Sequence, residues 1–154
     1  MALGDVVLYD IAAKKLAEGA YGNLNRTNIP MIVTLINNDQ KAAATDTEWV
    51  YTRVANYGDV KKSLTTSLTS GGETTIWTAQ PVTFRVPNPV GGATWDVYQA
   101  IIHESTTYLE DSEIFGFVDL TPDNGVTPWD LSASPITITW NATSGILKGV
   151  RVYK

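Results

Sequence analysis

The sequence lacks cysteine and contains a single histidine in 154 residues. Without cysteine there is no disulfide framework, cysteine-ligated zinc, cysteine-held iron–sulfur cluster or thiol nucleophile. One histidine excludes any site that needs two imidazoles, which includes the usual catalytic zinc sites. The sequence also has no Gly-x-Gly-x-x-Gly opening a helix, no P-loop and no Gly-x-Ser-x-Gly elbow. We therefore expect no enzymatic activity, no metal and no other cofactor.

Positive charge is scarce and unevenly placed. Eleven Lys and Arg residues against sixteen Asp and Glu residues give a net charge of −5, so we expect no nucleic-acid partner. Residues 86–147 contain eight acidic residues and no Lys or Arg, whereas residues 1–85 are neutral. This pattern is either ordinary surface charge or one acidic face that points to solvent.

Long hydrophobic runs are missing as well. No segment approaches the roughly 20 apolar residues that span a membrane, so we expect no membrane partner. Acidic residues interrupt the N-terminus, and no apolar run there reaches signal-peptide length. We expect a protein that is made in a cytoplasm and not exported by a cleaved signal.

The residues that are present predict an all-β fold. The chain has the length of one domain, and a hydrophobic fraction of 44% supplies a core. One segment has helical character: Asp10 is a plausible N-cap, residues 11–18 favour a helix, and Gly19 is a stop. Short β-branched or alternating runs, separated by turn residues, cover 31–36, 48–54, 62–70, 74–78, 82–86, 94–103, 114–118, 135–140 and 146–153. About nine such strands indicate a jelly-roll-like sandwich with a short N-terminal helix.

A few polar residues have the chemistry of a site. His103 falls at an expected strand end, where we predict a partly exposed structural histidine. Carboxylates cluster at Glu104, Glu110, Asp111 and Glu113; paired carboxylates hydrolyse glycosides or bind calcium. Their spacing matches no such motif, so we expect a solvated loop over residues 105–112.

A second acidic loop contains an aromatic residue. Asp119, Asp123 and Asp130 flank it, and the run from Asp123 to Gly125 marks a tight turn. Trp129 in this loop is either an exposed platform that stacks on sugars or a side chain that packs the loop onto the sheet. The same alternatives apply to Trp95. The alternating strand around Trp77 favours core packing there.

The order of strands and loops over roughly residues 29–148 resembles a family of small virion proteins from tailed bacteriophages. The matching pieces are Met31–Ile36, Trp49–Arg53, Pro81–Phe84, Trp95–Glu104, Ile114–Leu120, Pro135–Trp140 and Gly145–Leu147. Members of that family serve as capsid decoration (cement) proteins, head fibres or tail-fibre-associated proteins. The resemblance implies an all-β jelly-roll-like body, homotrimeric assembly and no enzymatic activity.

The first 28 residues lie outside this pattern. We accordingly divide the chain into an N-terminal arm with a short helix, residues 1–28, and a β-sandwich body, residues 29–154. The arm contains an apolar run formed by Leu3, Val6, Val7, Leu8 and Tyr9. Such a run either adds to the sheet edge of a partner, which makes these five residues candidates for capsid binding, or forms the first strand of the chain's own sandwich.

Two functional hypotheses follow. The first is a capsid decoration protein that stabilises the shell of a virion, bound to the major capsid protein as a homotrimer on the capsid surface. Repeated modest interfaces serve this role through avidity and need no reactive residue. The alternative is a tail-fibre or receptor-binding module that recognises host surface glycans, with Trp129 as its candidate residue.

Overall fold

The structure is a computed structural model of the 154-residue chain. It describes residues 5–19, 31–37, 42–48, 54, 60–71, 74–85, 95–104, 113–123 and 125–150. No helix in these ranges is long and apolar enough to cross a membrane.

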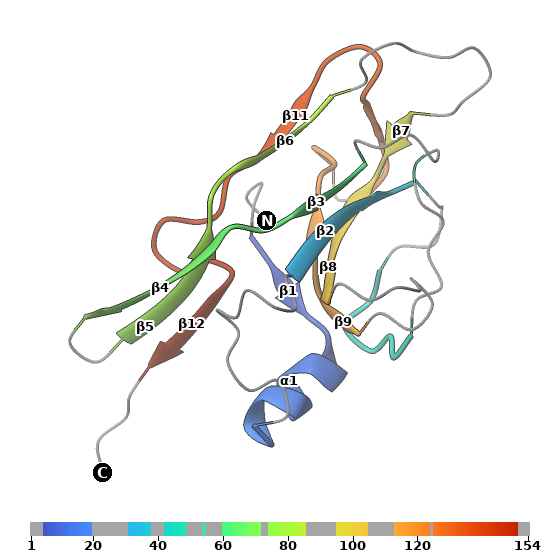
Figure 1. The fold of residues 1–154 in the computed structure, drawn as a ribbon. Helices are drawn as coiled ribbons and strands as arrows, with labels where there is room; N and C mark the ends of the chain where they lie inside the picture. Colours follow the sequence, from blue (N-terminus) through green and yellow to red (C-terminus); the bar gives the residue numbers. More distant parts are fainter. Residues whose placement is uncertain are drawn as a thin grey trace.

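Strands dominate the described chain (Figure 1). In chain order the elements are β1 (Val7–Leu8), α1 (Asp10–Ala17), β2 (Met31–Ile36), β3 (Lys61–Ser63), β4 (Thr66–Gly71), β5 (Thr74–Ala79), β6 (Val82–Phe84), β7 (Asp96–Val97), β8 (Gln99–Glu104), β9 (Ile114–Asp119), β10 (Trp129–Asp130), β11 (Ile136–Ile138) and β12 (Leu147–Val150). The all-β prediction is confirmed, including the short N-terminal helix.

The first layer is a five-stranded antiparallel sheet in the order β1-β9-β8-β2-β3. Its three central strands, β2, β8 and β9, are buried along almost their whole length. Their sequences are near-continuous apolar runs, the pattern of strands that are covered on both faces. Tyr9 packs against Phe117 on this sheet, with ring centroids 5.3 Å apart. The sheet therefore presents no open face along its central strands.

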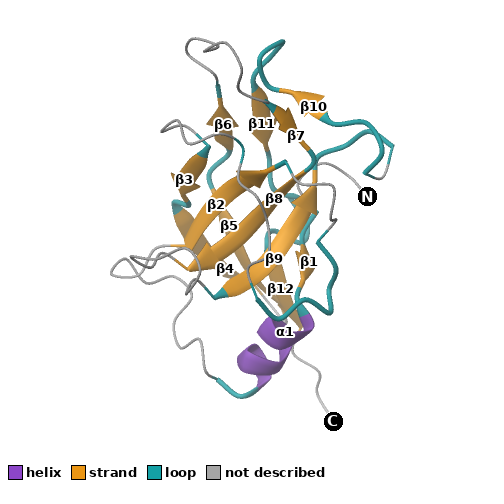
Figure 2. Cartoon of the chain, turned by 90° about the vertical axis from the view of Figure 1, so that its right-hand side faces the viewer, coloured by secondary structure: helices purple, strands orange, loops and turns teal. Residues whose placement is uncertain are grey.

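The second layer lies behind the first (Figure 2). It contains the three-stranded sheet β12-β5-β4 and the pair β11-β6. The chain runs from β5 into β6 and from β11 into β12, so these strands form one long antiparallel ribbon, interrupted by a turn at Asn141–Gly145. A further two-stranded pair, β10-β7, lies at the end of the molecule near β6 and β11.

The two layers share one hydrophobic core. Phe115 lies where β8 and β9 shift register, and its ring meets Trp77 of β5 edge-on, with centroids 5.3 Å apart. Phe84 and Ile138, from β6 and β11, are fully buried. The indole N–H of Trp140 donates to the carbonyl of Gln80 at 3.1 Å. Each layer thus buries the other, which is the general requirement for a sheet with one apolar face.

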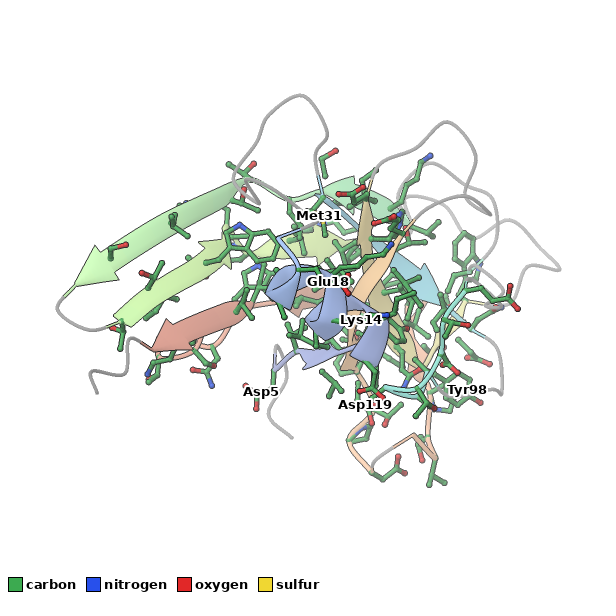
Figure 3. All side chains as sticks on the ribbon, turned by 90° about the horizontal axis from the view of Figure 1, so that it is seen from below. Asp5, Lys14, Glu18, Met31, Tyr98 and Asp119 are labelled. Carbon is green, nitrogen blue, oxygen red and sulfur yellow. The ribbon has the colours of Figure 1, made fainter. Side chains whose placement is uncertain are left out.

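Part of the second layer extends past the body. We call β4, β5 and β12 the projecting sheet, because Figures 1 and 3 show these strands reaching beyond the rest of the described chain. Residues 67–71 of β4 are all exposed, and every residue of β5 except Trp77 is only half-buried. Both observations indicate a single layer of strands in this region.

The described part of the N-terminal segment packs against the five-stranded sheet. β1 pairs antiparallel with β9, Val7 opposite Phe117 and Leu8 opposite Gly116. A Cβ atom on Gly116 would lie 2.8 Å from the carbonyl oxygen of Val7, so only glycine admits β1 this closely. Of the two alternatives for the apolar run, the structure supports a strand of the chain's own sheet.

Several boundaries differ from the sequence prediction. The expected strand 62–70 divides into β3 and β4, which edge different layers, and the expected strand 94–103 divides into β7 and β8. Residues 49–53 of the expected strand 48–54 lie outside the described chain. Tyr9 rather than Asp10 precedes the helix, and Gly19, with φ +71°, follows its end as predicted.

Candidate interaction surface

The predicted capsid-binding run offers little free surface. Tyr9 is completely buried, and Val6, Val7 and Leu8 are half-buried against the core. Leu3 lies outside the described residues. In this conformation the described part of the run packs on its own sheet, and capsid binding by these residues stays a prediction.

A shallow cleft opens beside this run. It has a volume of about 380 Å³ and lies between β1, the turn before β12, and β12 itself. The amide of Asn141 donates to the carboxylate of Asp5 at 2.9 Å at its edge, and Figure 3 shows Asp5 beside β1 and β12. The Asp5 carboxylate in the cleft therefore already accepts a hydrogen bond within the chain, and this bond links the segment before β1 to the turn before β12.

His103 is buried, which corrects the expectation of partial exposure. Its ring is 1% exposed and lies within hydrogen-bond distance of two groups. Nδ1 lies 2.8 Å from the carbonyl oxygen of Glu104, and Nε2 lies 2.8 Å from the hydroxyl of Thr34. Because a carbonyl only accepts, Nδ1 carries a proton, and in the neutral ring Nε2 accepts from the Thr34 hydroxyl. The histidine thus links β8 to β2.

The first acidic cluster is only partly within the described chain. Glu104 and Glu113 pair through the backbone at 3.0 Å. The carboxylate of Glu113 also accepts from the Lys15 ammonium at 2.5 Å, which ties α1 to β9. Glu110 and Asp111 lie outside the described residues. Within the described ranges no three His, Cys, Asp or Glu side chains are grouped to hold a metal ion.

The second acidic loop uses its carboxylates to fix its own backbone. Asp123 accepts from the hydroxyl of Thr127 at 2.5 Å and from its N–H at 2.7 Å. Asp130 accepts from the hydroxyl of Ser132 at 2.6 Å and from its N–H at 2.9 Å. These hydroxyl and backbone donors lower the pKa of both carboxyl groups below the usual value of 3.8. Asp119 fastens the same loop by accepting from Thr121.

Trp129 packs its loop onto the sheet. It belongs to β10, opposite Val97 of β7, and its ring is half-buried against the core. Its indole N–H donates to the carbonyl of Ser134 at 3.2 Å. Trp95 and Trp77 are 7% and 2% exposed, so both pack in the core. None of the three presents a fully exposed ring for stacking on a sugar.

The projecting sheet contains a run of exposed residues. β4 and β5 contain no charged residue, and their exposed groups are threonine and serine hydroxyls, backbone and one leucine. Leu68 is 53% exposed, one of two large apolar side chains with high exposure. β4 also forms an edge of its sheet. The sequence predicted a strand here, but a single leucine in an uncharged run of Thr and Ser was also a signal of an exposed edge.

Hydrogen bonds show how the backbone of β4 is oriented. The N–H of Gln80 donates to the carbonyl of Thr65 across the two strands at 3.0 Å, whereas the carbonyl of Trp77 accepts from Ile146 at 2.8 Å. Hydrogen-bonded and non-hydrogen-bonded pairs alternate along an antiparallel ladder. Leu68 lies opposite Trp77, and Trp77 turns its backbone toward Ile146. Leu68 therefore turns its own N–H and C=O away from β5.

The same alternation applies two residues to each side of Leu68. Thr66 and Ser70 also turn their backbone groups outward. The backbone N–H and C=O groups of Leu68 and Ser70 thus point away from β5. No other described strand pairs with this edge.

In comparisons with known proteins, no protein-family model, no curated protein and no solved structure matches the chain.

Proposed function

We propose that this chain is a structural protein of a tailed-bacteriophage virion, specifically a capsid decoration protein with a jelly-roll-like body. It binds the major capsid protein on the outer surface of the shell and assembles as a homotrimer. The support from the sequence is the resemblance over residues 29–148, whose strand-bearing pieces correspond to β2, β6, β8, β9 and β11.

The observation that carries the proposal is the contrast between a closed body and the projecting sheet. In the body, the polar side chains that could take part in chemistry make structural hydrogen bonds instead. His103 bonds to Thr34, and Asp123 and Asp130 fix the backbone of a loop. The projecting sheet instead offers uncharged backbone and hydroxyl groups. A decoration protein needs a surface that contacts neighbouring subunits, and it needs no reactive residue. Weak contacts at many repeated sites add up to stable binding through avidity.

The distribution of charge fits the same role. Carboxylates of the region without cations, such as Glu113, Asp123 and Asp130, lie exposed on the body. A shell component with an acidic solvent face remains soluble while its uncharged surface contacts its neighbours. Both features are compatible with a part that stabilises an assembly.

Quantitative mass spectrometry of purified virions tests the proposal. A decoration protein is expected at a copy number comparable to that of the major capsid protein. A count of only tens of copies would assign the chain to a tail fibre and contradict the decoration role. Absence from the virion would overturn the structural role altogether.

The trimer has its own test. Light scattering coupled to size-exclusion chromatography is expected to give a mass that is a multiple of three times the chain mass of 16.7 kDa. A monomer at all protein concentrations would contradict the cement function in its trimeric form.

A further inference from the structure

The side chain of Trp77 contains a buried donor that lacks an acceptor. Trp77 is 2% exposed, and its indole N–H has no hydrogen-bond partner in the described part of the chain. By contrast, Trp129 and Trp140 each donate their indole N–H to a backbone carbonyl. A buried tryptophan usually finds such a partner. The unpaired N–H of Trp77 therefore points to an acceptor that comes from outside the chain.

The cleft between β1 and β12 lies directly beside this tryptophan. Leu147 of β12 is opposite Trp77 of β5, and it lines the cleft. Gly145 and Ile146 also line the cleft, and both approach the Trp77 backbone. The N–H of Ile146 donates to the Trp77 carbonyl at 2.8 Å, and a Cβ atom on Gly145 would lie 2.5 Å from the same oxygen. This wall of the cleft is thus the strand next to Trp77.

The opposite wall of the cleft leads to the same part of the core. Figures 1 and 2 both place β1 next to β12. Leu8 of β1 is opposite Gly116 of β9 and lines the cleft. Phe115, the neighbour of Gly116 in the chain, meets the Trp77 ring edge-on, with centroids 5.3 Å apart. The pair of Trp77 and Phe115 therefore lies behind both walls, where the two layers meet.

We propose that this cleft binds a short aliphatic molecule with one uncharged oxygen acceptor, such as a ketone or an alcohol. The hydrocarbon part of the ligand contacts the aliphatic lining, which is Val6, Leu8, Ile146 and Leu147. The oxygen of the ligand reaches past Leu147 and accepts from the indole N–H of Trp77. The inference does not rest on the proposed virion function.

The size of the cleft and the character of its inner end select this class of ligand. A volume of about 380 Å³ lies within the range of small-molecule pockets, about 300–1,000 Å³. An ionised head group would lose its hydration beside Trp77 and Phe115, which belong to the hydrophobic core. A pure hydrocarbon would leave the indole N–H unpaired. An uncharged acceptor on an aliphatic body avoids both costs.

The polar part of the lining also suits an uncharged ligand. It consists of Asp5, Asn141, Ser144 and Lys148. One carboxylate and one ammonium give these residues no net charge, so the lining as a whole selects neither an anion nor a cation. Asn141 donates to Asp5 at 2.9 Å, and this bond joins β1 to the turn before β12 whether or not a ligand is bound.

A titration followed by proton–nitrogen NMR tests the site, with cyclohexanone as the probe. The indole resonance of Trp77 is identified as the one that disappears in Trp77→Phe. In the wild-type protein this resonance is expected to move downfield and to saturate as cyclohexanone is added, because the N–H gains an acceptor. The methyl resonances of Leu8 and Leu147 should saturate at the same ligand concentration.

Trp77→Phe also separates the hydrogen bond from the apolar contact. It removes the N–H and keeps an aromatic ring against Phe115. The affinity for cyclohexanone, measured from the methyl resonances, is expected to fall about tenfold. The affinity for cyclohexane, which has the same ring and no acceptor, should not fall.

A matched pair of leucine variants tests the position of the ligand and does not alter Trp77. Leu147 and Leu68 are both opposite Trp77, on β12 and β4, but only Leu147 lines the cleft. Leu147→Ala removes part of the aliphatic wall and should weaken the binding of both cyclohexanone and cyclohexane about fivefold. Leu68→Ala is the control and should leave both affinities unchanged.

Three results would overturn the inference. The first is a wild-type indole resonance of Trp77 that does not move and saturate with cyclohexanone. The second is a cyclohexanone affinity that a folded Trp77→Phe variant retains. The third is an equal effect of Leu147→Ala and Leu68→Ala, which decides the matter even if Trp77→Phe does not fold. A nuclear Overhauser contact from the indole proton to a long-lived water, with no response to cyclohexanone, would assign the donor to a buried water instead.

Discussion

The five-stranded sheet and the projecting sheet are built from opposite kinds of strand. The central strands of the five-stranded sheet are apolar on both faces and are covered on both faces. The strands of the projecting sheet that lie farthest from the body are polar and uncharged, and they are exposed. In the first sheet, burial fixes the register, because a slip of one residue would move polar groups such as Thr34 and His103. In the second, the backbone hydrogen bonds between β4 and β5 hold the register.

The largest difference between the two sheets should appear when a large side chain is removed from each. Phe115→Ala deletes a fully buried ring that joins the layers, and is expected to lower the free energy of unfolding by about 3–5 kcal/mol. Leu68→Ala, at low protein concentration, should change it by less than about 0.5 kcal/mol, because Leu68 is half-exposed on a single layer. Denaturant unfolding followed by circular dichroism measures both values. Equal losses for the two variants would mean that the projecting sheet is as well packed as the body.

A second comparison tests the joint between the body and the projecting sheet. Gly145 has φ +59°, and a Cβ atom there would lie 2.5 Å from the carbonyl oxygen of Trp77 and 2.7 Å from a methyl of Ile76. Gly145→Ala is therefore expected to cost about 2–4 kcal/mol, from backbone strain and the clash together. Gly19→Ala is the control: φ is +71° but nothing lies within 4 Å, so only the conformational cost of about 1 kcal/mol remains. Equal losses of unfolding free energy would show that the turn moves away from β5 freely.

A third variant tests whether the N-terminal segment is held by the body. Gly116→Ala would place a Cβ atom 2.8 Å from the carbonyl oxygen of Val7 and from a methyl of Val6. It is expected to displace β1 at a cost of about 1–3 kcal/mol. The amide of Tyr9, which donates to the carbonyl of Phe115 at 3.2 Å, should then exchange with solvent at least ten times faster.

Gly71→Ala provides the control for that measurement. Gly71 lies at the tip of β4, and a Cβ atom there meets nothing within 4 Å. It should leave the exchange of the Tyr9 amide unchanged. If Gly116→Ala also leaves it unchanged, close approach to Gly116 is not what holds β1 on the sheet.

These results show which features local sequence determines. The position of β2 was predicted to the residue, because an apolar run bounded by turn residues has few alternatives. The division of residues 62–70 was not predicted, since Thr and Ser continue through both strands and only the partners change. The burial of His103 was missed because its strand continues past it: the N–H of Glu104 still bonds to the carbonyl of Glu113.

The surface was harder to predict than the strands. Whether the apolar run before α1 pairs within its own chain depends on contacts with β9, more than a hundred residues away in sequence. The glycine at position 116 was a signal of that close approach, but it identifies no partner by itself. The exposure of β4 follows from how far it extends beyond the body. The uncharged run of Thr and Ser with one leucine was a signal of an exposed edge, but it does not determine that extent.

The smallest expected effect concerns charge, which separates the two regions as clearly as burial does. β4 and β5 contain no carboxylate, whereas the loop before β10 is fastened by Asp123 and Asp130. Hydrogen bonds to the ionised form lower the pKa of both groups in the folded protein. Their contribution to stability is therefore present above the ordinary value of 3.8 and is lost as the pH falls through the lowered folded value. Carbon-13 NMR of the carboxyl groups should place both titration midpoints below 3.8.

Thr127→Val removes the hydroxyl that has the largest influence on Asp123. The pKa of Asp123 should then move back toward 3.8, while the pKa of Asp130 stays unchanged. Ser132→Ala should do the reverse, and a midpoint for either wild-type carboxyl at or above 3.8 would show that the loop does not rely on these bonds in solution.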